Sequence, residues 1–264
     1  MIRLYEAGMS TCAQKVRFTL EQKGLPWEGI TVDLHGGENY SPEFRKINPK
    51  AIIPVLDDDG DMIYESNSIC IYLDEKYPET PLMPANPKGR ADVRELLQAI
   101  DEQIHHDSSA LTYGIAFRPG VRAKYDTEEK LQGYLNGMPD AGRRASKGDV
   151  IRKGVESTEC TIAVQRLSLI LSRLEEKLQN SAFLVGNQLT IADIAYSPYM
   201  TRLTHLKLAG MWADKPAVSD WFDRVVATEG YQKGLAAYFN PEVVARMEGG
   251  GEKAWPTVQS IMQA

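Results

Sequence analysis

Two adjacent hydroxyl groups and a thiol lie close to the amino terminus, in the run Ser10-Thr11-Cys12. The apolar residues 2–5 before this run are typical of a short strand, and residues 13–23 after it have the spacing of a helix. The run therefore lies where a helix begins. The first turn of a helix has free backbone N–H groups and a partial positive charge, so it stabilises an anion. A hydroxyl at this place donates to a bound thiolate, and a cysteine at this place ionises more readily.

Two later segments accompany this helix start. An apolar strand at residues 51–56 is entered through Ile53-Pro54, and the pair Glu65-Ser66 opens another helix. The S-x-C helix start, the I-P-V-L strand and the E-S pair, in this order and spacing, resemble the amino-terminal domain of the glutathione transferases. The resemblance makes the three segments interpretable as parts of one site.

Within this resemblance a hydroxyl is the expected activator of the glutathione thiol. Residues 10–17 are most similar to the zeta-class pattern S-S-C-x-x-R-V-R, and they depart from it at Thr11 and Lys15. A free thiol has a pKa of roughly 8.5, and lowering that pKa by about two units takes about 2.7 kcal/mol. One hydrogen bond to the thiolate together with a helix N-terminus supplies this free energy. We assign the hydrogen bond to Ser10, with Thr11 as the alternative, and Cys12 is either a redox thiol or a small buried residue.

The resemblance implies a glutathione site around these residues. The Ile53-Pro54 bond is expected to be cis, which exposes the backbone of Ile53 for pairing with the cysteinyl part of glutathione. Glu65 is expected to bind the γ-glutamyl ammonium, and Ser66 the γ-glutamyl carboxylate at the start of its helix. Asn67 is expected to assist these two residues.

The glycyl carboxylate of glutathione needs a cation, and Lys50 or His35 is expected to meet it. No metal site is expected, because the three cysteines are widely spaced and the adjacent His105-His106 have no second ligand pair. The same spacing excludes a disulfide framework, so a reducing cytoplasm is the expected compartment.

The elements that must position the site alternate in type across residues 1–83. Strand, helix, strand, helix, two strands and a helix follow one another, an order typical of a thioredoxin-like α/β domain. Prolines near residues 84–87 mark a linker, and residues 88–264 are expected to be an all-helical domain with the second-substrate site. The T-I-A-D stretch at 190–193 has the form of a capping box and again resembles the glutathione transferases.

Three stretches of the helical region carry further expectations. Residues 118–149 form a long polar insertion, for which we consider a lid, a partner surface or local disorder. Residues 150–179 are predicted to form one long helix. The tail from Asn240, with its run of three glycines at 249–251, is predicted to be an appended segment.

The composition and net charge argue against several classes of protein. The 264 residues are 43% hydrophobic and 25% charged, as in an ordinary globular protein, and are long enough to bury a sizeable core. The net charge of −6 argues against nonspecific binding to nucleic acid or to an anionic membrane surface. No apolar run reaches the ~18 residues of a transmembrane helix.

The family resemblance implies a transferase in which glutathione attacks a hydrophobic, aromatic electrophile. The S-x-C motif, the stretch at residues 111–114 and the polar insertion also resemble bacterial enzymes of aromatic catabolism. Cleavage of the β-aryl ethers of lignin-derived dimers is the leading expectation. Three alternatives remain. One is reductive dehalogenation of haloaromatics, a reaction that needs Cys12. The others are zeta-like cis–trans isomerisation and a binding module without catalysis. The resemblance also implies a dimer, of identical or of different chains.

Overall fold

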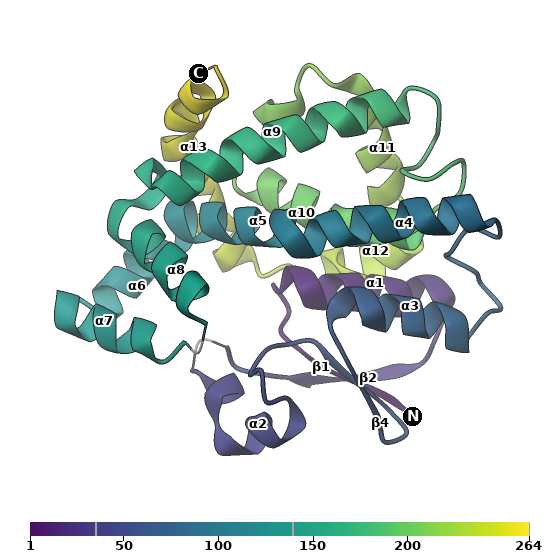
Figure 1. Ribbon diagram of the computed structural model, residues 1–264, viewed down its shortest axis with the longest axis horizontal. Coiled ribbons are helices and arrows are strands. Elements are labelled where there is room, and N and C mark those ends of the chain that lie inside the picture. The colour runs from purple at the N-terminus through teal and green to yellow at the C-terminus, as the bar shows by residue number, and fades with distance from the viewer. Residues whose placement is uncertain (35, 139, 264) are drawn as a thin grey trace. The chain divides into compact units, whose positions relative to one another are not determined.

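The computed structural model describes residues 1–34, 36–138 and 140–263 (Figure 1). Its internal contacts divide the chain into two compact units. The first unit contains residues 1–98, 180–198 and 220–240. The second unit contains residues 99–179, 199–219 and 241–264, of which 264 lies outside the described residues. Each unit is described by itself below.

The sheet of the first unit has the strand order β2-β1-β3-β4. β1 is parallel to β2 and antiparallel to β3, and β3 is antiparallel to β4. Helices α1 and α3 pack against one another, as Figure 1 shows. The elements of this part follow the order predicted from the sequence: β1 (Ile2–Glu6), α1 (Thr11–Lys23), β2 (Trp27–Thr31), α2 (Pro42–Ile47), β3 (Val55–Asp58), β4 (Asp61–Tyr64) and α3 (Ser66–Lys76). The expected thioredoxin-like α/β arrangement is confirmed.

Local signals set the ends of these helices. Ser10 caps α1 and Ser41 caps α2, each by accepting a hydrogen bond from a backbone N–H in the first helical turn. Gly24 ends α1 with a φ of +66°, a left-handed conformation that costs glycine little. β3 begins at Val55, later than the strand predicted from residue 51, because Pro54 has no N–H to donate to a neighbouring strand.

Helices from the carboxyl-terminal half complete the first unit. α12 (Glu229–Gly234) packs on α1, and a Cβ atom at Gly234 would lie 2.7 Å from the backbone nitrogen of Phe18. This close approach requires glycine. The unit also takes in most of α4 (Pro87–Ala99) and parts of α10 (Ile191–His205) and α11 (Pro216–Val226).

Asp193 reaches back to Thr190, as predicted from the capping-box form of residues 190–193. Asp193 Oδ2 accepts hydrogen bonds from the backbone N–H and the hydroxyl of Thr190, both at 2.8 Å. Its Oδ1 accepts from Leu184 N and Trp221 Nε1, also at 2.8 Å. Asp193 is fully buried, so these four donors hold a carboxylate that joins the helix start to two other segments.

The second unit is helical in its described residues, as expected. It contains α5 (His105–Thr112), α6 (Arg118–Lys124), α7 (Glu128–Asn136), α8 (Ala141–Lys153), α9 (Thr158–Leu178) and α13 (Pro241–Met262), with π-helical turns at Ile100–Ile104 and Tyr113–Phe117, and it includes the remaining parts of α10 and α11. One predicted helix is divided in two. The helix expected over 150–179 is interrupted at Gly154, whose φ is +68°, and it restarts at Ser157, which caps α9.

The polar insertion at 118–149 contains α6, α7 and the greater part of α8. Leu131, Leu135 and Met138 form a small hydrophobic core with Ile151, which follows in α8, and Tyr125 packs against them. Local disorder is therefore wrong for the described residues of this insertion. The insertion buries enough apolar surface of its own to hold three helical segments together.

The carboxyl-terminal tail is not an appended segment, which corrects the sequence prediction. α13 buries Met247, Ala254 and Val258. Within the same unit, a Cβ atom at Gly251 would lie 1.7 Å from the carbonyl oxygen of Leu206. The glycine run therefore lets a helix pack at short range.

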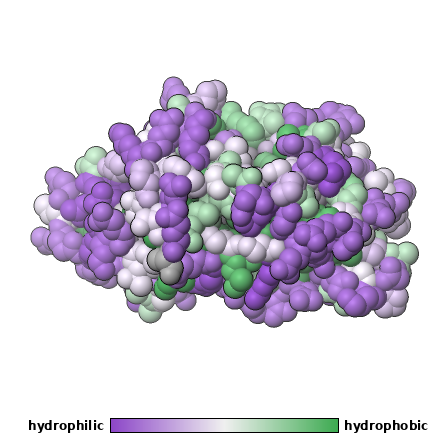
Figure 2. Space-filling view, turned by 90° about the horizontal axis from the view of Figure 1, so that it is seen from above, coloured by the Kyte–Doolittle hydropathy of each residue, from purple (hydrophilic) through white to green (hydrophobic). Residues whose placement is uncertain are grey.

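Surface polarity agrees with the mean hydropathy of −0.34. On the face drawn in Figure 2, hydrophilic side chains predominate and hydrophobic ones form separate small patches. Across residues 1–34, 36–138 and 140–263, no helix combines the length and apolar character needed to span a bilayer.

Candidate functional site

Strand register brings three chemically interesting segments to one end of the sheet. Tyr5, near the end of β1, pairs with Val55 at the start of β3, and Val55 pairs with Tyr64 at the end of β4. The loop to Ser10 leaves β1 at this end, Ile53-Pro54 enters β3 there, and Glu65 leaves β4 there. Residues about 50 positions apart thus meet at one edge, as the sequence analysis required.

Ser10 is fixed as the N-cap of α1. Its Oγ accepts a hydrogen bond from Ala13 N at 3.3 Å, and its own N–H donates to Ala7 O at 2.9 Å. A hydroxyl that accepts in this way keeps its own O–H for donation. Thr11 is buried, Cys12 is partly exposed, and the first turn of α1 contains no acidic residue.

The loop before Ser10 is held by Arg17, a residue to which the sequence analysis gave no role. Arg17 forms a buried ion pair with Glu6, and its Nη2 donates to Gly8 O at 2.7 Å. Its Nε donates to Gly234 O at 2.8 Å. A planar guanidinium with several donors thereby ties the end of β1 to the loop that carries Ser10.

The Ile53-Pro54 peptide bond is cis, which confirms the sequence prediction. Two asparagines hold the loop before it: Asn48 Nδ2 donates to Ile52 O and Asn39 Nδ2 to Ala51 O, both at 2.8 Å. Both asparagines are buried. Nothing in the local sequence marks them, because their partners are fixed by the fold.

The start of α3 has an unusual backbone and a buried cation beneath it. Glu65 has a φ of +64°, a conformation that costs a non-glycine residue about 1–3 kcal/mol. Ser66 and Asn67 are buried. Lys15 Nζ donates to Ser66 Oγ at 3.3 Å and to Asn67 Oδ1 at 3.1 Å, while Asn67 Nδ2 donates to Leu97 O at 3.1 Å.

Lys50 and Glu65, which the sequence analysis assigned to opposite ends of glutathione, form an ion pair. Lys50 Nζ lies 2.6 Å from Glu65 Oε1, and the two side chains are 67% and 51% exposed. The hydrogen bond to Glu65 raises the pKa of Lys50 above its ordinary value. His35, the alternative to Lys50, lies outside the described residues.

Two family models match this chain. Residues 4–81 match the glutathione S-transferase N-terminal domain, and residues 150–229 match the glutathione S-transferase C-terminal domain. The chain belongs to the glutathione S-transferase family.

Individual members of the family are similar over most of the chain. Protein LigF of Sphingobium sp. strain SYK-6 is 30% identical over 234 residues, which are 86% of this chain and 90% of LigF. A zeta-class glutathione S-transferase of Euphorbia esula is 46% identical over 199 residues, 75% of this chain and 73% of that protein. The crystal structure of the β-etherase LigF matches with a TM-score of 0.78 at 25% identity, covering 89% of this chain and 99% of that one.

The other two cysteines of this glutathione S-transferase family member belong to its core. Cys70 and Cys160 are buried, and desolvation raises the pKa of each thiol to about 11. Both are therefore protonated at neutral pH. Cys12 is the partly exposed cysteine, and it lies two residues after Ser10.

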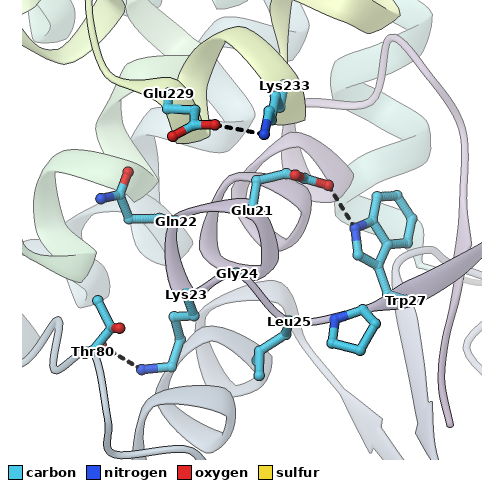
Figure 3. Close-up of a pocket in the computed structure, with 10 residues that line it drawn as sticks. Glu21, Gln22, Lys23, Gly24, Leu25, Trp27, Thr80, Glu229 and Lys233 are labelled. Atoms are coloured by element: carbon cyan, nitrogen blue, oxygen red, sulfur yellow. Dashed lines mark hydrogen bonds and ion pairs between the residues drawn. The ribbon is translucent and has the colours of Figure 1, made fainter.

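A hollow of about 670 Å³ lies at the other end of α1, around its last turn (Figure 3). Charged and polar side chains line it, and several are already paired: Trp27 Nε1 donates to Glu21, and Lys23 Nζ to Thr80 O. Glu229 and Lys233 also pair with one another. This hollow does not coincide with the residues that the motifs of a glutathione S-transferase single out.

No group of three or more His, Cys, Asp or Glu side chains with the geometry to hold a metal ion occurs in the described part of the chain.

Proposed function

We propose that this protein activates glutathione at Ser10 and transfers its sulfur to an aromatic electrophile, with cleavage of a β-aryl ether as the reaction. The observation that carries the proposal is the convergence of Ser10, Ile53-Pro54 and Glu65 at one end of the sheet. A thiol held against the first turn of α1 meets a hydroxyl donor and the positive end of a helix, and both favour the thiolate.

The residues at this edge fit the polar groups of glutathione. Ser66 accepts from Lys15, which leaves its O–H to donate to the γ-glutamyl carboxylate at the N-terminus of α3. The Glu65 carboxylate suits the γ-glutamyl ammonium, and Lys50 suits the glycyl carboxylate. The backbone of Ile53 would pair with the cysteinyl unit. Asn67, whose amide is bonded to Lys15 and Leu97, would assist by holding the first turn of α3 in place.

The reaction follows from the chemistry of a bound thiolate. The glutathione sulfur attacks the carbon that bears the aryloxy group, so that a C–S bond forms and the C–O bond breaks. The phenoxide leaves with the electron pair and takes a proton from water. No atom of the protein changes its oxidation state. Similarity to the β-etherase LigF over 89% of this chain and 99% of that one supports this substrate class.

A product analysis tests the proposal. The purified protein is incubated with glutathione and a set of β-aryl ether dimers, and products are followed by mass. We expect one free phenol and one glutathione thioether for each ether cleaved. Phenol release with oxidised glutathione in place of the thioether would contradict the proposal and support a reductive reaction.

The requirement for Cys12 distinguishes sulfur transfer from a reductive reaction. Reductive dehalogenation requires a second thiol that removes glutathione from the conjugate by thiol–disulfide exchange, and Cys12 lies two residues after Ser10. A Cys12→Ser variant should keep its full rate of ether cleavage, because transfer needs the glutathione thiolate alone. Loss of turnover in this variant, with the conjugate accumulating, would instead support the reductive reaction.

Glutathione-dependent cis–trans isomerisation is the second candidate. The zeta-class relative, 46% identical over 199 residues, favours it. In this reaction glutathione adds to a double bond, permits rotation and leaves again. The concentration of free thiol therefore stays constant during isomerisation and falls during transfer.

A dimer and a cytoplasmic location remain part of the proposal, since both are typical of the glutathione S-transferase family. Sedimentation of the purified chain, alone and with candidate partner chains, tests the dimer. A protein that binds no glutathione and transfers none to generic electrophiles would instead be a binding module built on this fold.

A further inference from the structure

Lys147 lies in α8 with its amine on the face of an aromatic ring. Its Nζ is 2.9 Å from the centroid of the Tyr113 ring. Phe117, in the same π-helical turn as Tyr113, packs edge to face with that ring, and the two centroids are 5.5 Å apart. All three residues belong to the second unit. On this side the amine therefore meets ring surface in place of water, and the local dielectric constant is low.

The surroundings of Lys147 disfavour an ammonium ion. Across residues 1–34, 36–138 and 140–263, its Nζ forms no hydrogen bond and no ion pair. A ring face attracts an ammonium ion by about 0.5–2 kcal/mol, which offsets only part of the cost of burying an unpaired one. Burial, with a smaller contribution from the like charge of Arg143 one turn earlier in α8, lowers the pKa of Lys147 well below its ordinary value. More of this amine is therefore uncharged near neutral pH than of an exposed lysine.

The charged groups that neighbouring elements bring to α8 have other partners. They are His106 of α5 with Ser146, Asp107 of α5 with Arg166, Glu159 of α9 with His106, Glu128 of α7 with Arg152, and Arg118 of α6 with the carbonyl oxygens of Ile151 and Arg152. Within α8 itself, Asp149 pairs with Lys153 at 2.7 Å. None of these carboxylates forms an ion pair with Lys147, so its lone pair stays available.

An unprotonated lysine amine is a nucleophile. Enzymes obtain one by removing the lysine from water or by placing it beside another cation. Lys147 meets both conditions, because it packs on Tyr113 and follows Arg143 by one turn. The residue is still partly exposed, so a small molecule can reach it. Aldehydes condense readily with such an amine, and an aromatic aldehyde would also pack against the two rings.

We propose that Lys147 is a covalent binding site for aromatic aldehydes. The lone pair of Nζ attacks the carbonyl carbon, and a proton passes from the nitrogen to the carbonyl oxygen to give a carbinolamine. Loss of one water molecule then forms the C=N bond of an imine. Neither step consumes an oxidant or a reductant, and addition of water reverses the reaction. The inference goes beyond the proposed function, because it uses residues of the second unit alone and needs no glutathione.

Lys153 supplies a matched control on the same helix. Its ammonium is paired with Asp149 at 2.7 Å, and its side chain is 58% exposed. Accessibility alone would make Lys153 the more reactive of the two lysines. Preferential reaction at Lys147 therefore reports the environment of its amine.

The experiment traps the imine on the full-length protein. The protein is incubated with benzaldehyde at neutral pH and treated with cyanoborohydride, which reduces the imine to a stable benzylamine, and labelled peptides are mapped by mass. We expect Lys147 to carry at least about tenfold more label than Lys153, the gain in free amine when a pKa falls by one unit. The ratio should shrink at about pH 10, where exposed lysines also lose their protons. Equal labelling of the two residues at neutral pH would overturn the proposal.

Butyraldehyde tests whether the site prefers an aromatic aldehyde. It condenses with amines in the same way but has no ring, so its label at Lys147, relative to that at Lys153, should be about fivefold lower than that of benzaldehyde. Tyr113→Phe should keep this preference and Tyr113→Leu should lose most of it. The same ratio for both aldehydes in the wild type would overturn the assignment to aromatic aldehydes. Both decisive measurements use the wild type, and ether cleavage is measured separately, so failure of this inference leaves the proposed function standing.

Discussion

Lys50 Nζ lies 2.6 Å from Oε1 of Glu65, the residue that directly follows strand β4. We assigned Glu65 to the γ-glutamyl ammonium of glutathione and Lys50 to the glycyl carboxylate, and in this structure the two side chains pair with each other. Under the proposed function, binding of glutathione would exchange this one ion pair for two. Because both side chains are more than half exposed, the pair itself adds little to the stability of the fold.

Glu65→Gln tests that exchange. The amide cannot form an ion pair with the γ-glutamyl ammonium, so the dissociation constant of glutathione should rise about tenfold. The temperature of unfolding should hardly change, since the side chain is exposed. Calorimetric titration and thermal unfolding measure the two effects. Unchanged glutathione binding in this variant would remove Glu65 from the site.

Ser10→Ala should lower kcat/KM by about ten- to a hundredfold, because a hydrogen bond to a charged acceptor is lost. The pKa of the bound glutathione thiol should rise toward its free value of roughly 8.5, so the loss should be larger at neutral than at alkaline pH. Rate measurements across this pH range test both statements.

The matched control for Ser10 is Ser41→Ala, which removes the equivalent cap of α2. Each variant should lose about 1 kcal/mol of stability through its missing cap. Only Ser10→Ala should lose activity. Full activity in Ser10→Ala would move the role of thiol activator to Thr11.

Two glycines of α13 should respond in opposite ways to alanine. A Cβ atom at Gly251 would lie 1.7 Å from the backbone oxygen of Leu206, so Gly251→Ala should destabilise the protein by about 3 kcal/mol or more. At Gly249 the same atom would meet nothing within 4 Å, and Gly249→Ala should stabilise the helix by about 0.5–1 kcal/mol. Chemical unfolding of both variants measures the difference, and equal effects would contradict the close packing of α13.

His205 should make the protein less stable in mild acid. Burial, with a smaller contribution from Arg202 and against the attraction of Glu248, lowers the pKa of His205 to about 4. In the unfolded chain its pKa is roughly 6.5. The unfolded state therefore binds the proton more readily, and stability should fall as the pH drops from about 6.5 to about 4.

A His205→Gln variant isolates this contribution. Its stability should change less than that of the wild type between about pH 7.5 and about pH 5, as measured by chemical unfolding at each pH. The same decrease in both proteins would assign the acid sensitivity to other groups.

Features that depend on neighbouring residues were readable in the sequence. Ser10 and Ser41 cap the helices that follow them, and Asp193 reaches back to Thr190 at the start of α10. Each is decided within a few residues, because a helix start needs an acceptor two or three positions before its free N–H groups. Motif order then led to the glutathione S-transferase family.

Contacts between distant residues were decided by the tertiary structure alone. Lys15 reads only as a departure from a motif, yet it donates to Asn67, 52 positions away. Gly251 reads as part of a loose tail, yet it packs against Leu206. Such partners are fixed by how strands register and helices dock, and neither local propensity nor periodicity specifies them. The sequence by itself determined which groups gather at the end of the sheet, and the tertiary structure decided which buried side chains hold them there.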